Sequence, residues 1–83
     1  MTNYVVKIEV KFKPGVLDPQ GETIKNALSN LNYSGIESVK TGKLFNVSLE
    51  AGSVDEALNI ARDLADKLLA NTVIEDYEVN ILR

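Results

Sequence analysis

Three carboxylates close together near the C-terminus, Glu75, Asp76 and Glu78, are the first candidates for chemistry. Side chains of an extended strand alternate between its two faces, so Asp76 and Glu78 share a side and Glu75 lies opposite. This spacing is poor for a paired general acid and base. Asp76 and Glu78 offer oxygen ligands for a hard cation, but a solvated strand edge explains the same pattern and is the interpretation we favour.

No other set of residues predicts a reaction. The chain has no Cys and no His, which excludes thiol nucleophiles, disulfides and metal sites built on sulfur or imidazole. Its five glycines form no phosphate-binding pattern. Lys43 follows Gly42 and could bind an anion, although an exposed lysine in a turn is the simpler interpretation. Asp18 precedes Pro19, and helix capping explains it fully.

Composition indicates one globular domain over residues 1–83, with 45% hydrophobic and 25% charged residues. The net charge is −3, divided into +2 for residues 1–43 and −5 for residues 44–83. An acidic chain is a poor nucleic-acid binder, so we expect no nucleic-acid partner. The first residues show no signal-peptide pattern, and no apolar run approaches membrane-spanning length. We therefore expect a cytoplasmic protein with no membrane partner.

The first half of the chain predicts a strand and a helix. Residues 4–12 alternate apolar and charged side chains, as in a strand with one buried face. Asp18 and Pro19 predict a helix start, and residues 32–35 (Asn-Tyr-Ser-Gly) predict its end. Between them, four apolar residues form one stripe that we expect to pack on the sheet: Ile24, Ala27, Leu28 and Leu31.

The second half predicts a hairpin, a helix and a last strand. Residues 36–41 and 44–50 are separated by Gly42-Lys43, which suits a hairpin turn, although the first arm has weak alternation. Ser53 and Glu56 form a capping box for a second helix, and Asn71 is a plausible left-handed cap at its end. The expected apolar stripe of this helix is Ala57, Ala61, Leu64, Ala65 and Leu68, and the last strand carries Tyr77, Val79 and Ile81.

The resulting order, β-α-β-β-α-β, predicts a ferredoxin-like α+β fold. Its four-stranded antiparallel sheet would carry both helices on one face, with the first and third strands in the centre. An RNA-recognition module needs aromatic residues exposed on those strands, but Phe12 and Phe45 share the parity of the core residues. A metallochaperone would need a Cys pair after the first strand, where Pro14-Gly15-Val16-Leu17 stands.

Self-association is expected because the second helix is more apolar than one sheet face requires. Leu58 and Leu69 widen its apolar surface in a chain too small to cover it. The long last strand, residues 73–82, could also cross to a partner's sheet. We therefore expect a dimer or a tetramer, with strand exchange as one route.

Three segments together carry a family resemblance. They are Leu17-Asp18-Pro19-Gln20-Gly21, Gly42-Lys43, and residues 67–71 (Lys-Leu-Leu-Ala-Asn) running into residues 73–77 (Val-Ile-Glu-Asp-Tyr). With these segments the chain closely resembles the PurS family, the small subunit of phosphoribosylformylglycinamidine synthase, over its whole length. Thr72 stands where many members have Pro, and Ala65 where many have Cys.

The resemblance implies a non-catalytic role in purine biosynthesis. In this family the large synthetase subunit binds ATP, Mg²⁺ and formylglycinamide ribonucleotide, and a glutaminase subunit releases ammonia. The small subunit joins the two and helps contain the ammonia path, with no catalytic, cofactor or metal residue of its own. The candidate interface residues are Leu17, Asp18, Gln20, Lys43, Leu58, Leu69, Glu75, Asp76 and Tyr77.

An ACT-like regulatory domain is the alternative. ACT domains share the β-α-β-β-α-β order, often dimerise, and bind amino acids through the loop between the first strand and first helix. Residues 13–18 of this chain occupy that place.

Overall fold

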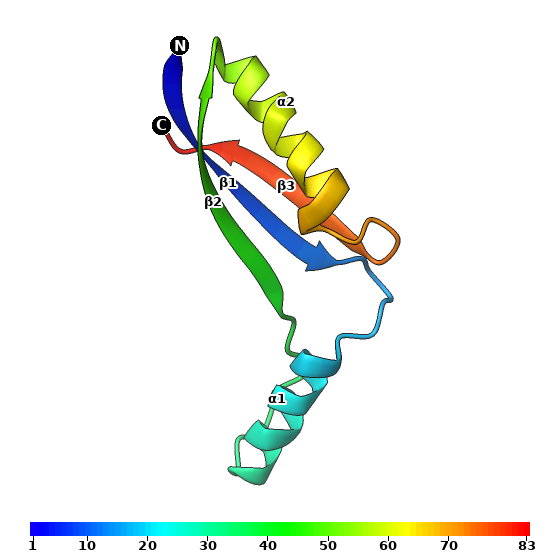
Figure 1. The fold of residues 1–83 in the computed structure, drawn as a ribbon. Helices are drawn as coiled ribbons and strands as arrows, with labels where there is room; N and C mark the ends of the chain where they lie inside the picture. Colours follow the sequence, from blue (N-terminus) through cyan, green and yellow to red (C-terminus); the bar gives the residue numbers. More distant parts are fainter.

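The computed structural model describes all residues, Met1–Arg83, and contains one antiparallel sheet (Figure 1). The strands follow the order β2-β1-β3, and no helix is long and apolar enough to cross a bilayer. Along the chain the elements are β1 (Thr2–Phe12), α1 (Pro19–Asn30), β2 (Gly42–Ala51), α2 (Val54–Leu64), the π-helical turn η1 (Ala65–Leu69) and β3 (Glu75–Ile81).

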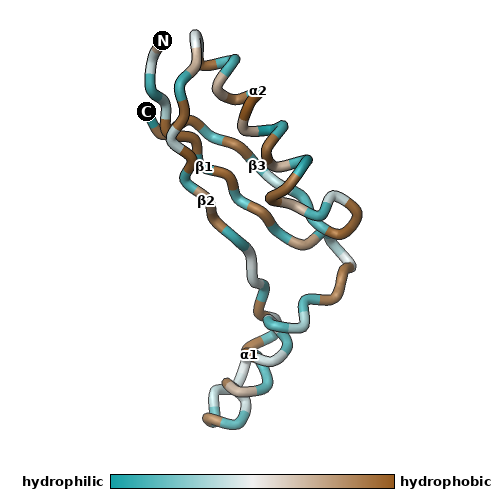
Figure 2. Tube along the Cα trace, viewed as in Figure 1, coloured by the Kyte–Doolittle hydropathy of each residue, from teal (hydrophilic) through white to brown (hydrophobic).

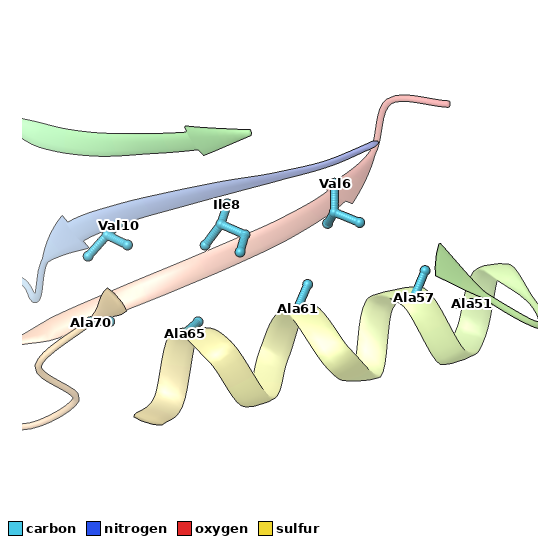
Figure 3. Close-up of a cluster of buried hydrophobic side chains, with 8 residues drawn as sticks. All are labelled: Val6, Ile8, Val10, Ala51, Ala57, Ala61, Ala65 and Ala70. Carbon is cyan, nitrogen blue, oxygen red and sulfur yellow. The ribbon is translucent and has the colours of Figure 1, made fainter. Parts of the chain in front are cut away.

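The core lies between the central strand β1 and helix α2. Val6, Ile8 and Val10 alternate along β1 and are fully buried or nearly so. Small residues face them, so that the helix backbone lies close to the sheet (Figure 3): Ala51, Ala57, Ala61, Ala65 and Ala70. The alternation of β1 and the alanine spacing of α2 therefore produce one thin layer of apolar contact, as the sequence predicts for these two elements.

The π-helical turn extends this alanine line beyond α2. Ala57, Ala61 and Ala65 are spaced by four residues, but Ala70 follows Ala65 by five. The amide of Ala70 donates to the carbonyl of Ala65 at 2.9 Å, which is the wider hydrogen-bonded ring of a π-helix. The wider turn places Ala70 on the core side. In contrast, Leu68 is 82% exposed and Leu64 38% exposed, so the expected burial of these two residues is wrong.

The four-stranded sheet predicted from the sequence is wrong, because residues 36–41 form no strand. They run back beside α1 instead, where the backbone of Val39 contacts Gly21 and Thr41 bonds Asp18. Gly42-Lys43 consequently begin β2 rather than forming a hairpin turn. Strand β2 is therefore an edge strand, with no fourth strand beside it, and only β1 is central.

Helix α1 does not pack on the sheet, so the prediction of two helices on one sheet face is also wrong. It projects from one end of the sheet, while α2 covers the face (Figure 1). Gly21 is its one buried residue, and Leu31 in the expected stripe is 67% exposed. Apolar positions gather along β1, β3 and α2, whereas α1 is mostly polar (Figure 2). Ile24 and Leu31 of the expected stripe are exposed, so this stripe does not pack on the sheet.

The predicted helix starts are confirmed. Asp18 accepts a hydrogen bond from the amide of Gly21, and Ser53 accepts one from the amide of Glu56. At the end of α1, Asn32 adopts a left-handed φ of 68°. Asn71 does not adopt this conformation, so its predicted left-handed cap is wrong. Its side-chain oxygen instead accepts from the amide of Val73 at 3.2 Å, which forms a turn before β3.

Candidate functional site: the loop end of the sheet

Parts of all three resemblance segments, residues 17–21, 42–43 and 71–77, meet at one end of the sheet, which we call the loop end. It consists of the end of β1 with the following loop (residues 11–18), the start of α1 (residues 19–21), the start of β2 (residues 40–43) and the start of β3 (residues 71–77). Strand register brings them together, since Lys11 pairs with both Gly42 and Asp76, and Phe12 pairs with Glu75. Segments far apart in sequence therefore form one continuous surface.

Asp18 joins two of these segments and is only 3% exposed. One carboxylate oxygen accepts from the amide of Gly21 at 2.9 Å, and the other accepts from the amide of Thr41 at 2.6 Å. The Thr41 hydroxyl lies 2.9 Å from both oxygens. The amide of Thr41, followed by that of Gly21, lowers the pKa of Asp18 below its ordinary value, and burial acts in the opposite direction. Asp18 is thus an ionised structural link between α1 and the start of β2.

Glu75 forms the second buried link. Its side chain is 9% exposed and reaches across the sheet to Lys43, at 3.7 Å between Nζ and Oε2. Its other oxygen accepts from the amide of Asn71 at 2.7 Å. These contacts place a carboxylate on the α2 side of the sheet and satisfy it there. Sequence reasoning found no structural reason for a charge at this position. The structure gives one, because the carboxylate accepts a hydrogen bond from the turn at Asn71.

The other candidates at the loop end face solvent or the core. Leu17 is 69% exposed, Gln20 is exposed, and the Asp76 side chain is 65% exposed. Asp76 lies 4.0 Å from the Nζ of Lys13. Tyr77 is partly buried against the core; burial raises its pKa, and the Asp66 carboxylate adds to this effect. Leu17, Gln20, Lys43 and Asp76 are therefore available to a partner.

Leu58 and Leu69 lie outside the loop end, on α2 and η1. Both are partly buried and pack against the core cluster. The exposed apolar surface of this helical segment comes from other residues instead, namely Val54, Leu64 and Leu68. The structure thus brings together seven of the nine candidate interface residues and separates these two.

The outer face of the sheet, opposite α2, carries two of the three C-terminal carboxylates, whereas Glu75 lies on the α2 side. Asp76 and Glu78 share this face, and Glu78 lies directly opposite Glu9. Lys7 bonds Glu9 at 3.0 Å, and this hydrogen bond lowers the pKa of Glu9. No three side chains of the metal-ligating types come close enough to hold an ion. The face is a charged, solvated surface with two ion pairs, Lys7 with Glu9 and Lys13 with Asp76.

A cavity of about 420 Å³ opens beside the Asp18–Thr41 link. Its walls are the end of β1, the following loop and the start of β2, and they include three lysines: Lys11, Lys13 and Lys40. Sequence reasoning missed Thr41, Lys11 and Lys40 as parts of this end. Their role depends on residues 36–41 lying beside α1, and neither periodicity nor capping patterns indicate that path.

The sequence matches the family model for PurS, described as phosphoribosylformylglycinamidine (FGAM) synthase, over residues 5–83. The PurS subunit of phosphoribosylformylglycinamidine synthase from Bacillus subtilis is 38% identical over 78 residues, covering 94% of this chain and 92% of that protein. The corresponding subunit from Methanocaldococcus jannaschii is 35% identical over 78 residues, covering 94% of each chain.

Solved structures agree in fold. The crystal structure of Bacillus subtilis PurS has a TM-score of 0.85 at 38% identity and covers 96% of this chain and 99% of that one. A chain in the structure of PurLQS from Thermotoga maritima has a TM-score of 0.87 at 32% identity, covering 99% of this chain and 100% of that one. The similarity extends over nearly the whole chain, so the sheet with its projecting α1 is a shared arrangement.

Proposed function

The chain belongs to the PurS family, the PurS subunits of phosphoribosylformylglycinamidine synthase in purine biosynthesis, and we propose that it joins the synthetase and glutaminase subunits without catalysing a step itself. A related PurS chain occurs in the PurLQS structure from Thermotoga maritima, which supports assembly with further components. The ACT-like alternative is not favoured, because the family match extends over residues 5–83.

One observation carries the proposal: the exposed candidate residues at the loop end are attached to backbone segments that two buried, hydrogen-bonded carboxylates hold in place. Asp18 and Glu75 are buried and satisfied, so they fix the backbone without meeting a partner. Leu17, Lys43 and Asp76 stand beside them and remain exposed. A rigid frame that presents an apolar residue and two opposite charges suits protein recognition, because little side-chain and loop order is lost on binding.

Self-association is part of the proposal. The radius of gyration is 16.5 Å, whereas a compact chain of this length would have about 12 Å. Only 11 of 83 residues are buried, and α1 presents exposed Ile24 and Leu31 away from the sheet. Strand β3 pairs with β1 of the same chain, so strand exchange is not part of this proposal. We propose that a dimer or tetramer covers the exposed apolar residues of α1 and the free edge of β2.

The chemistry is assigned to the partners. We propose that the large subunit binds ATP, Mg²⁺ and formylglycinamide ribonucleotide, that the glutaminase subunit supplies ammonia, and that this chain helps contain its transfer. The chain itself takes no cofactor in this proposal. We propose that the complex is located in the cytoplasm, together with the substrates of purine biosynthesis.

The decisive experiment combines a pull-down with two activity measurements on the purified synthetase and glutaminase subunits. Adding this chain should produce a complex of all three proteins and glutamine-dependent turnover. Turnover with ammonium salts in place of glutamine should change little, because it bypasses the transfer. If omitting the chain leaves both complex formation and glutamine-dependent turnover intact, the bridging role is wrong.

Three substitutions test the loop end: Leu17→Ala, Lys43→Ala and Asp76→Ala. Each should weaken complex formation, and the two charge removals should act most strongly at low salt. Leu68→Ala and Lys67→Ala are the matched controls, since both residues are exposed and lie outside the loop end. If all five variants bind the catalytic subunits equally, these residues have no place in the interface.

Sedimentation equilibrium tests self-association separately. A dimer or tetramer is expected at micromolar concentration, and Leu31→Glu should shift it toward monomer. A wild-type chain that is monomeric at that concentration would contradict the proposal.

A further inference from the structure

The cavity at the loop end is basic in a chain that is acidic overall. Lys11, Lys13 and Lys40 line it, together with Phe12, Val16 and Asp18, while the whole chain has a net charge of −3. The three lysines come from β1, from the loop after it and from the segment before β2. The fold therefore gathers positive charge in one concave place from two separate parts of the sequence.

The positive charge in the cavity is only partly neutralised. Asp18 is its one carboxylate, and both of its oxygens already accept hydrogen bonds from Gly21 and Thr41. Three carboxylates lie beside Lys11 on the outer face: Glu9 pairs with Lys7, Asp76 pairs with Lys13 at a long 4.0 Å, and Glu78 forms no ion pair. Lys11 and Lys40 form no ion pair. An incoming anion would thus meet two ammonium groups, those of Lys11 and Lys40, that are in no ion pair, although Glu9 and Asp18 lie near enough to interact with them.

We propose that this cavity binds a small organic phosphate. Lysine acts as a point charge, and several ammonium groups suit a phosphate dianion. The cavity volume of about 420 Å³ lies in the range of small-molecule sites and exceeds what a phosphate group fills. Phe12 and Val16 supply apolar wall for the organic part of the ligand.

The site consists of residues of this chain alone, so the proposal does not depend on the bridging role. A phosphate bound here would contact the loop after β1, which leads into α1, and residues 40–42, which Asp18 ties to the start of α1. Binding should therefore further stabilise the link between the sheet and α1. This goes beyond the proposed function, which requires no ligand on this chain.

The test is a titration of the isolated chain with phenyl phosphate, followed by backbone amide NMR at constant ionic strength. We expect saturable shifts at Gly15, Val16, Thr41 and Gly42. Inorganic phosphate should produce smaller shifts at the same amides, because it lacks the organic part. Benzoate matches the aromatic ring with a carboxylate and should bind more weakly.

Pairs of substitutions that remove the same charge at different places distinguish a specific binding site from general electrostatic attraction to the chain. Lys13→Gln with Lys40→Gln should raise the Kd for phenyl phosphate at least about tenfold, as expected for losing charge-assisted contacts. Lys25→Gln with Lys67→Gln removes the same charge elsewhere and should change the Kd little. If circular dichroism shows that the first pair disturbs folding, Lys40→Gln alone is used, since Lys40 is exposed.

Three outcomes would overturn the proposal. The first is an absence of saturation at about 10 mM phenyl phosphate, since binding that weak is far below the affinity of a specific site of this size. The second is equal affinity for benzoate and phenyl phosphate. The third is equal weakening of binding by the two pairs of lysine substitutions. The last outcome would mean an adventitious ion only. None of them bears on the pull-down with the catalytic subunits, so the two proposals fail independently.

Discussion

Asp18 and Thr41 are 23 residues apart in sequence, yet the Thr41 amide donates to the Asp18 carboxylate at 2.6 Å and its hydroxyl lies within 2.9 Å of both carboxylate oxygens. One side chain thus caps α1 and also fixes the entry to β2. Because α1 contributes little to the core, this link and the neighbouring contact of Gly21 determine where the helix points.

Acid should release this link. The pKa of Asp18 is lowered in the folded chain, chiefly by the Thr41 amide, so its stabilising contribution is complete above the ordinary aspartate pKa of about 4. The contribution is then lost as the pH falls through the lowered folded-state pKa. The NMR shifts of the Gly21 and Thr41 amides should follow this titration. In Asp18→Asn the titration should disappear from both amides; its persistence there would assign it to another group.

Gly21→Ala should disturb the path of residues 36–41. A Cβ at this position would collide with the carbonyl oxygen of Val39, which is backbone and cannot rotate away. Alanine is otherwise favoured over glycine in a helix by about 1 kcal/mol, so an observed loss of stability would come from the collision. Ser29→Ala, on the exposed part of the same helix, is the control. Chemical denaturation of both variants gives the comparison, and a stabilised Gly21→Ala would contradict the close approach.

The two partners of the Lys43–Glu75 ion pair should differ in their effect on stability. Lys43→Ala removes an exposed partner and should change the free energy of unfolding by less than about 1 kcal/mol. Glu75→Ala should cost more, about 1–3 kcal/mol, because the part-buried amide of Asn71 loses its acceptor. Equal losses in urea denaturation would mean that the ion pair, rather than the turn contact, carries the stability.

The alanine line on α2 should not accept larger side chains. Ala61 is fully buried against β1, so Ala61→Leu should destabilise the fold by about 1–3 kcal/mol through overpacking. Leu68→Ala, at an 82% exposed position, should stay within about 0.5 kcal/mol of wild type. Thermal unfolding of the two variants checks both values. A tolerated Ala61→Leu would mean that α2 lies farther from the sheet than described.

Local sequence patterns correctly predicted the first strand and the starts of both helices. Alternation along residues 4–12 and the Asp18 and Ser53 caps each predict what is observed. The prediction of a strand at residues 36–41 failed because the apolar alternation there is weak. The contacts that decide its path, Thr41 with Asp18 and Val39 with Gly21, are long-range. The prediction that the apolar stripe of α1 packs on the sheet failed for a related reason. Periodicity shows which residues share one face of a helix, but not which part of the molecule that face contacts.

The sequence indicated which candidate residues to examine, but not which of them the fold buries and which it exposes. The resemblance selected Asp18, Lys43, Glu75 and Asp76, and the fold brings all four to the loop end. Only three-dimensional contacts show that Asp18 and Glu75 are buried while Lys43 and Asp76 face solvent. Leu58 and Leu69 were selected for apparent excess apolarity, and the small alanine layer explains why the sheet covers them in part.

The projecting helix has a mechanical consequence. Twelve residues of α1 span about 18 Å, and the helix is anchored mainly through its first turn. A rotation of about 10° at that anchor would displace the far tip by about 3 Å, so α1 would act as a lever with its pivot at Asp18. Small rearrangements around Asp18 would thereby be amplified at the tip of the helix, where a bound partner would be displaced by them.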